Sequence, residues 1–267
     1  MTDIAFIGAG RMASAIINGL IASSPETKER IICFSASGSS AAALSEKIGI
    51  RQATDLPELL LQANVVVVAF KPQHLSTADS RLAQLTAGKL VISVLAAKTL
   101  DHLSAVFPQA RNIVRTMPNT PSAIGAGITG WSAQRELSAE DRTTILSMLA
   151  SIGQELEVPE SKIDALMGVS GCGPAFVFEF TGALRDAGMT AGLTSEEAQK
   201  LAIQTVLGSA QLMARSSSSP EELRDQVTSP NGTTFAGLQR LSAHNLRGIM
   251  QEVVQASKSR SEELARA

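Results

Sequence analysis

The sequence predicts an α/β fold in which a mostly parallel N-terminal sheet is followed by an all-α C-terminal region. Short β-branched runs alternate with helical patterns in the first part of the chain, and after about residue 160 only helical periodicity remains. The 267 residues also exceed the usual size of a single domain. We therefore predict two domains, residues 1–160 and residues 161–267.

The N-terminal strands are predicted from short runs that are apolar along most of their length. These runs are Ile4–Ile7, Ile31–Phe34, Val65–Val68, Leu90–Val94 and Asn112–Arg115. Helical patterns at residues 12–22 and 40–48 separate the earlier runs. Strands without polar alternation indicate a mostly parallel sheet that is covered by helices on both faces.

The C-terminal region is predicted to form helices that lack a partner within one chain. The helical patterns cover residues 175–187, 195–214, 235–241 and 246–264. The segment Pro174–Phe180 is apolar nearly all round, and the last helix has one apolar face, so both need a covering surface. We therefore expect a homodimer or a higher assembly of dimers. The serine run before Pro220 favours a short loop between helices over a linker.

The composition excludes several classes of partner. Hydrophobic residues make up 44% of the chain, charged residues 18%, and the formal net charge is -2, so we expect no nucleic-acid partner. The strongest apolar runs, such as residues 65–70, are far too short to span a bilayer, and we expect no membrane partner. The N-terminal residues do not have the pattern of a secretory signal, which predicts a cytoplasmic protein.

Neither cysteine nor histidine forms a cluster that predicts metal or redox chemistry. Cys33 and Cys172 are far apart in the sequence, and we expect both to be reduced, structural thiols. His74, His102 and His244 are isolated, so we expect no histidine base.

A glycine-rich turn joins the first predicted strand to the first predicted helix. In the G-x-G-x-x-A pattern of residues 8–13, Gly8 permits a tight turn, Gly10 lets a pyrophosphate approach the backbone, and Ala13 allows close packing of helix on strand. The helix N-terminus offers free N–H groups to the anion. This predicts a Rossmann-type dinucleotide site, although a tight packing turn has the same residues.

The segment after the second strand bears on the choice of cofactor. Residues 34–40 contain no carboxylate that would bind both ribose hydroxyls and repel a 2′-phosphate, and Ser35 and its neighbours offer hydrogen-bond donors. This favours NADPH, with NADH possible. A flexible serine loop without selectivity is the alternative interpretation.

Loops after the later strands are expected to line the cofactor crevice, because ligands of open parallel sheets bind beyond the carboxyl ends of the strands. The residues concerned are Ala69, Phe70, Lys71, Pro72, Ala96, Ala97 and Asn119. Lys71 and Lys98 are equally explained as solvated side chains. The prolines on either side of Asn119 predict a stiff, extended loop.

The segment Leu223–Phe235 leads directly into a helix. Ser229, Gly232, Thr233 and Thr234 place hydroxyls and free amides at the helix start, which suits a small carboxylate. A capped turn between helices would use the same residue types.

Five segments together carry a resemblance to a known family. They are GAGRMA at residues 8–13, AFKP at 69–72, VRTMPNTP at 114–121, GVSGCGPAF at 168–176 and VTSPNGTTFAGL at 227–238. In this order they resemble pyrroline-5-carboxylate reductases over almost the whole chain. The resemblance implies a Rossmann domain, a helical dimerisation domain whose loop completes the substrate pocket, and NAD(P)H-dependent reduction of 1-pyrroline-5-carboxylate to L-proline, the last step of proline biosynthesis.

The resemblance also implies roles for individual residues. It assigns substrate contacts to Glu160, Thr233 and Thr234, and cofactor contacts to Gly8, Ala9, Gly10, Arg11, Met12, Ala13, Ser35, the 69–72 loop and Gln226. The chain departs from the family at Cys172, where serine is frequent, at Phe176, where tyrosine is frequent, and at Asn231, where glycine is common. Asparagine tolerates a positive φ, so we expect the last change to preserve the loop.

For such a substrate we assign the carboxylate to Ser229, Gly232 and Thr233, and the ring nitrogen to the Thr234 hydroxyl, which makes Thr234 the predicted catalytic residue. Because threonine is a weak acid, we expect it to orient the iminium or to relay a proton through water. A 3-hydroxyacid dehydrogenase is the alternative enzyme, but Lys162 and Lys200 lack the glycine-flanked helix expected for its catalytic lysine. A nicotinamide-binding regulator without turnover is the alternative of a different class.

Overall fold

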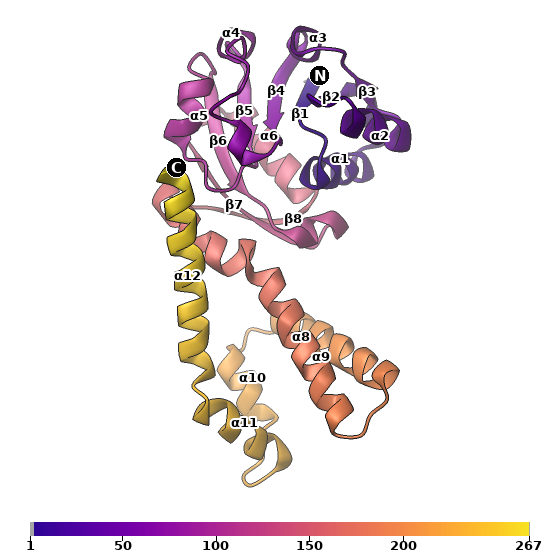
Figure 1. The fold of residues 1–267 in the computed structure, drawn as a ribbon, viewed down its shortest axis with the longest axis vertical. Helices are drawn as coiled ribbons and strands as arrows, with labels where there is room; N and C mark the ends of the chain where they lie inside the picture. Colours follow the sequence, from indigo (N-terminus) through magenta and orange to yellow (C-terminus); the bar gives the residue numbers. More distant parts are fainter. Residues whose placement is uncertain (1–2, 267) are drawn as a thin grey trace. The chain divides into compact units, whose positions relative to one another are not determined.

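The computed structural model describes residues 3–266 and divides into two compact units (Figure 1). The first unit extends to Cys172 and also includes the C-terminal segment from Ala256, and the second is Gly173–Gln255. The boundary between the two units thus lies later in the chain than the predicted domain boundary at residue 160, and the end of the last helix belongs to the first unit. The predicted boundary itself stays a prediction.

Within residues 3–266 the first unit contains one eight-stranded sheet in the order β3-β2-β1-β4-β5-β6-β7-β8. The strands are β1 (Asp3–Ile7), β2 (Ile31–Phe34), β3 (Arg51–Gln52), β4 (Ala63–Val68), β5 (Leu90–Ser93), β6 (Asn112–Met117), β7 (Gly127–Ala133) and β8 (Gly153–Glu157). All neighbours pair in parallel except β6 and β7, which are antiparallel. The predicted fold class, a mostly parallel sheet followed by helices, is confirmed.

Helices cover both faces of this sheet. The first unit contains α1 (Arg11–Ser23), α2 (Ser39–Ile48), α3 (Leu56–Leu60), α4 (Leu82–Leu85), α5 (Leu100–Val106), α6 (Ala139–Ala150) and α7 (Ile163–Leu166), with short 3-10 turns at Pro25–Arg30, Pro72–His74, Thr120–Ile124 and Glu160–Lys162 and a π-helical turn at Met167–Gly171. Successive strand residues belong to opposite cores: Ile4 and Phe6 to one, Ala5 and Ile7 to the other. This alternation explains why β1 is apolar at each position from Ile4 to Ile7.

Three strands have no counterpart among the predicted apolar runs. β3 has two exposed residues, and β8, at the edge of the sheet, has no buried residue and is polar at three of its five positions. β7 contains Gly130, which has no room for a Cβ because the Leu166 side chain packs directly on it. Edge strands and glycine-bearing strands lack the continuous apolar pattern on which the prediction depended.

The second unit consists of helices. They are α8 (Gly173–Thr190), α9 (Ser195–Arg215), α10 (Pro220–Gln226), α11 (Thr233–Ala243) and α12 (Leu246–Arg266), the last of which extends into the first unit. The Ser219 side chain accepts a hydrogen bond from the Glu222 N–H and caps α10, so the serine run is a short loop followed by a helix, as predicted.

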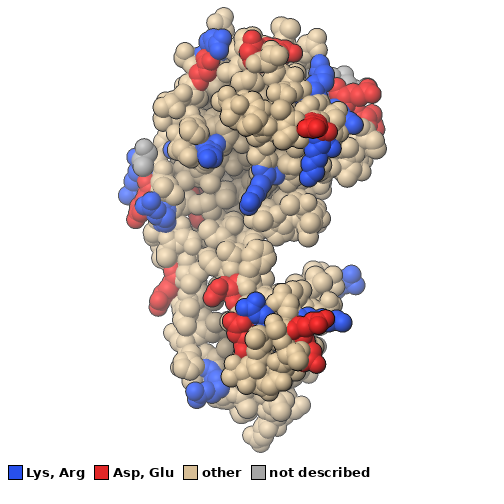
Figure 2. Space-filling model, turned by 45° about the vertical axis from the view of Figure 1, so that its right-hand side comes forward, with Lys and Arg blue, Asp and Glu red and all other residues tan. Residues whose placement is uncertain are grey.

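The helices of the second unit expose unusually many apolar side chains. No residue of α8 is buried, and Phe178 is 64% exposed. Figure 2 shows that charged side chains gather in small groups on the face it presents, with wide uncharged areas between them. Such a surface is typical of helices that are covered in an assembly.

By length and apolar composition alone, one helical stretch among the described residues, 160–190, could cross a membrane. The expectation of no membrane partner depended on the strand-like runs and did not include this stretch. Because helices that are buried at subunit interfaces have the same composition, the stretch is weak evidence for a membrane segment.

Candidate active site

The carboxyl ends of the parallel strands meet at one edge of the sheet. β1, β2, β4, β5 and β6 all end there, and they are followed by the loops that contain the predicted cofactor residues. The strand order reverses between β1 and β4, which lie side by side. A crevice outside such a switch point is where doubly wound sheets bind dinucleotides. The structure therefore brings together Gly8–Ala13, Ser35, the 69–72 loop, Ala96, Ala97 and Asn119 at this edge.

The turn after β1 depends on Gly8. Its φ is +107, and an added Cβ would lie 2.5 Å from the backbone C and O atoms of Ala69. The Gly8 N–H donates to the Phe34 carbonyl at 2.8 Å, and the Ala69 N–H donates to the Ile7 carbonyl at 2.8 Å. The turn is thus in direct contact with the loop after β4, and no larger residue fits without moving it.

The N-terminus of α1 is free to bind an anion. Gly10 precedes it in an extended conformation, no side chain caps the helix, and the space where a Gly10 Cβ would stand is open. Ala13 is fully buried against the sheet, whereas Arg11 is exposed at the helix start. Uncapped N–H groups with open space in front of them fit the pyrophosphate of a dinucleotide.

The serine loop after β2 has one buried hydroxyl, that of Ser35, and several exposed ones. Ser35 is 9% exposed, and its Oγ accepts a hydrogen bond from the Ala41 N–H at 3.1 Å. The exposed Ser37 and Ser39 hydroxyls lie 3.2 Å apart. Ser35 therefore stabilises the turn into α2 while its own proton stays available, and the exposed donors of the loop are its neighbours.

The loop after β5 holds a residue in an unusual conformation. Ala97 has a φ of +57 and is 5% exposed, and Ala96 is half-buried. A left-handed conformation is unfavourable for alanine, so the surrounding structure must hold it there. Strain of this kind at the carboxyl edge of the sheet fits a backbone that is shaped for a ligand.

Asn119 uses both ends of its amide within the protein. Its Nδ2 donates to the Ser170 carbonyl at 3.1 Å, and its Oδ1 accepts from the Ile128 N–H at 3.0 Å. Ser170 lies in the π-helical turn Met167–Gly171, and its carbonyl lacks the usual α-helical partner because Pro174 has no N–H. This gives Asn119 a structural role that the predicted cofactor contact did not include.

Glu160 belongs to an ion-pair network around the buried Arg115, beside the same edge. Its Oε1 accepts from the Leu100 N–H at 2.6 Å and from the Arg115 Nη1 at 3.1 Å. The Arg115 Nη2 donates to Asp164 Oδ1 at 3.2 Å, and the same oxygen accepts from the Ser261 hydroxyl at 2.7 Å. The sequence interpretation did not include Arg115, Asp164 or Ser261. The one available signal was a charged residue within the apolar run of β6.

The predicted substrate loop lies in the second unit. Gly232 precedes α11 without any side-chain cap, and its N–H donates to the Ser229 carbonyl at 3.0 Å. Ser229, Thr233 and Thr234 are exposed, and Gln226 is exposed at the end of α10. Asn231 has a φ of +59, a left-handed conformation that asparagine tolerates better than most residues, as expected for an intact loop. The structure thus gathers these hydroxyls and amides at one helix start.

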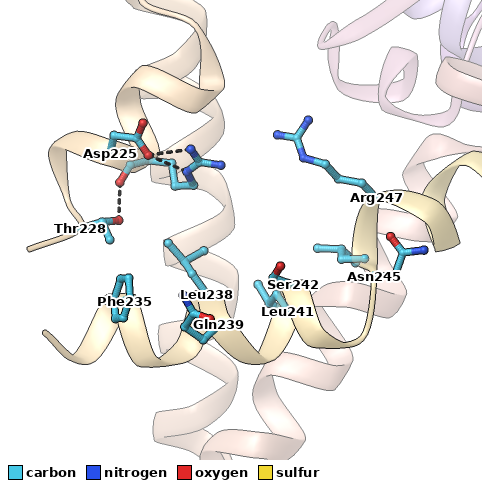
Figure 3. A pocket seen from close by; sticks show the side chains of 11 residues that line it. Asp225, Thr228, Phe235, Leu238, Gln239, Leu241, Ser242, Asn245 and Arg247 are labelled. Atoms are coloured by element: carbon cyan, nitrogen blue, oxygen red, sulfur yellow. Dashed lines mark hydrogen bonds and ion pairs between the residues drawn. The ribbon is translucent and has the colours of Figure 1, made fainter. Parts of the chain in front are cut away.

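A hollow of about 550 Å³ lies in the second unit, and Thr228 and Phe235, which flank the predicted substrate segment in the sequence, contribute to its lining (Figure 3). It is lined by α11 residues such as Phe235, Leu238 and Leu241, and by the ion pair of Arg224 and Asp225. None of the residues predicted to bind substrate lines it. Four of its eleven lining residues are apolar and seven are polar or charged, and because none of the predicted substrate residues is among them we do not regard it as the active site.

The sequence predictions also concerned the cysteines and the possible metal ligands of the chain. Within 3–266 no group of three or more His, Cys, Asp or Glu side chains could hold a metal ion. Both cysteines are free, and burial raises the pKa of the Cys33 thiol to about 11, as expected for an unreactive structural thiol.

Known proteins resemble the chain over its entire length. Residues 160–264 match the family described as pyrroline-5-carboxylate reductase dimerisation, and residues 3–97 match NADP oxidoreductase, coenzyme F420-dependent. A pyrroline-5-carboxylate reductase of Synechocystis is 39% identical, with 99% of this chain and 98% of the relative aligned. The solved pyrroline-5-carboxylate reductase of Coxiella burnetii has a TM-score of 0.92 at 34% identity, covering 100% of this chain and 99% of that one. The NADP-bound pyrroline carboxylate reductase of Plasmodium falciparum has a TM-score of 0.86 at 26% identity, covering 99% of this chain and 98% of that one. The chain therefore belongs to the pyrroline-5-carboxylate reductase family.

Proposed function

We propose that this protein reduces 1-pyrroline-5-carboxylate to L-proline with NADPH, the last step of proline biosynthesis. The observation that carries the proposal is the uncapped start of α11, where Thr233 and Thr234 are exposed in the segment that resembles the family. An uncapped helix start attracts a small carboxylate, and the adjacent hydroxyls supply directed donors. The family membership and the dinucleotide turn in the first unit support the same reaction.

We assign the substrate carboxylate to the Ser229 hydroxyl and to the N–H groups of Gly232 and Thr233. The Gly232 N–H donates to the Ser229 carbonyl in the free enzyme, so this donor is shared or released when substrate binds. The Thr234 hydroxyl is assigned to the ring nitrogen, and Glu160 to a further substrate contact. Thr234 orients the iminium or relays its proton through water, because its own acidity is too low to make it the proton source.

The cofactor is assigned to the carboxyl edge of the sheet in the first unit. The N–H groups at the start of α1 hold the pyrophosphate, with Arg11 beside it, and the 69–72 and 94–98 loops line the crevice. When bound, the nicotinamide supplies the hydride that the imine carbon accepts. The absence of a carboxylate in residues 34–40 supports NADPH over NADH. Gln226 is kept as a cofactor contact on the family resemblance alone.

We further propose that the second unit forms a homodimer, or a larger assembly of dimers, through α8 and the apolar face of α12. Phe178 and Phe180 are 64% and 52% exposed in the single chain, which is unfavourable unless a partner covers them. The mass in solution, measured by light scattering at micromolar concentration, tests this assignment, and a monomer would contradict it. The cytoplasm is the proposed compartment, which two free cysteines support.

Steady-state kinetics with 1-pyrroline-5-carboxylate tests the function directly. We expect turnover with both cofactors and a higher kcat/KM with NADPH. Nicotinamide binding without turnover would contradict the proposal and favour a regulator instead.

A further inference from the structure

Arg115 is a buried charge in the middle of the sheet. Its side chain is 3% exposed, and its neighbours on β6 include Ile113 and Val114, which are fully or almost fully buried. Burying an unpaired guanidinium is strongly unfavourable, so its partners must compensate for the loss of water. Those partners are Glu160 at 3.1 Å and Asp164 at 3.2 Å.

The contacts of Glu160 involve only one of its two carboxylate oxygens. Oε1 accepts from Leu100 and from Arg115, and no hydrogen bond to Oε2 is found among residues 3–266. The Glu160 side chain is 31% exposed. Leu100 directly follows the loop at residues 94–99, which lies at the cofactor edge. Two donors from different elements therefore fix the carboxylate beside this edge while its second oxygen is available to a ligand.

Asp164 is fixed in turn by the C-terminal helix. The Ser261 hydroxyl donates to Asp164 Oδ1 at 2.7 Å, and Ser261 is 1% exposed. The network thus joins β6, the turn at Glu160–Lys162, α7 and the end of α12, all within the first unit. Hydrogen bonds from several elements to a polar network around a buried charge restrict the orientation of each member.

We propose that Arg115, with Asp164 and Ser261 behind it, is a positioning residue that orients the Glu160 carboxylate for the substrate. The inference rests on the proposed function, in which Glu160 contacts the substrate. Arg115 acts through Glu160, so its removal matters only while that carboxylate is present.

Double-mutant kinetics tests this coupling. Glu160→Gln and Arg115→Met should each raise the KM for 1-pyrroline-5-carboxylate about ten- to hundredfold, as expected for a lost hydrogen bond to a charged group. The KM for NADPH should change by less than about twofold, and the double variant should be no worse than Glu160→Gln within about twofold, since coupled residues do not add. Arg111→Met is the matched control, because Arg111 precedes β6 at its opposite end and pairs with Asp141 at 2.7 Å. It should lower the melting temperature and leave both KM values unchanged.

Ser261→Ala and Arg115→Lys test the same positioning role with smaller changes, in case Arg115→Met does not fold. Ser261→Ala removes one hydroxyl from the network and should raise the KM for 1-pyrroline-5-carboxylate about threefold without affecting the KM for NADPH. This rise is a fraction of that expected for losing a hydrogen bond to a charged group. The positioning role would be overturned if the substrate KM of the double variant rose by the product of the two single effects. A parental substrate KM in both Ser261→Ala and Arg115→Lys would also overturn it. A parental KM in Glu160→Gln would also overturn it, while turnover by that variant would leave the reductase function intact. A parental protein without turnover would instead overturn the proposed function.

Discussion

Asn231 offers a sharp test of how the substrate loop is built, because its backbone has a φ of +59 between Pro230 and Gly232. A left-handed conformation costs an ordinary L-residue about 1–2 kcal/mol, whereas glycine adopts it freely and asparagine more easily than most residues. Alanine at this position must bear that cost. Since the loop is exposed and the Gly232 N–H to Ser229 bond is one of its few internal contacts, we expect the loop to relax. The cost should then appear as weaker substrate binding, with a KM about five- to thirtyfold higher.

The assay compares Asn231→Ala with Asn231→Gly by steady-state kinetics and thermal melting. The glycine variant should retain the parental KM for 1-pyrroline-5-carboxylate, because it relieves the backbone. Asn245→Ala is the control: its φ is +51 in the turn before α12, outside the substrate loop, and its Oδ1 accepts from the Gly248 N–H. That change should lower the melting temperature and leave KM unaltered. Equal impairment by alanine and glycine at 231, or parental kinetics in Asn231→Ala, would refute the reasoning.

Three further outcomes are expected. Thr234→Val should lower kcat/KM about ten- to two-hundredfold with folding and NADPH affinity preserved, whereas a loss of stability alone would remove Thr234 from the catalytic site. Ser35→Asp should shift the preference from NADPH towards NADH, since a carboxylate there can still accept from the Ala41 N–H while repelling a 2′-phosphate; equal parental kcat/KM values for both cofactors would contradict this. The Cys33 thiol, with a pKa raised from 9.0 to about 11 by burial, contributes stability that is complete below pH 9 and lost as pH rises to about 11. Cys33→Ala should flatten the pH dependence of unfolding in that range, and an unchanged slope would contradict the assignment.

The parts of the fold that could be predicted share a local cause. The five predicted strands are largely buried on both faces, so apolar residues dominate four of the runs, and β6 keeps Ile113 and Val114 between Asn112 and Arg115. β7 and β8 could not be found in this way. Their pairing is decided by packing from distant residues, such as Leu166 over Gly130, and by an edge position that tolerates polar side chains.

The residues of the candidate site also fall into two groups, those with a local signal in the sequence and those without one. The turn at Gly8 and the uncapped start of α1 follow from local chemistry, because glycine at a strand end and a helix N-terminus have the same meaning in any such sheet. Arg115, Asp164 and Ser261 form bonds across as many as 97 residues, and no periodicity links such partners. Only the isolated charge within β6 pointed to them.

Asn119 shows that a long-range contact can have a local signal, because Pro174 removes the N–H that would serve the Ser170 carbonyl. Asn119→Ala would leave that carbonyl without its side-chain donor and the Ile128 N–H without an acceptor, at roughly 1–3 kcal/mol for each group left unsatisfied. We expect a lower melting temperature with NADPH affinity within about twofold of the parental value. Asn119→Asp keeps the acceptor for Ile128 but sets a carboxylate oxygen against the Ser170 carbonyl, so its melting temperature should fall at least as far as that of Asn119→Ala. If Asn119 instead contacts the cofactor directly, NADPH affinity will fall in both variants while the melting temperature of the free enzyme stays near the parental one.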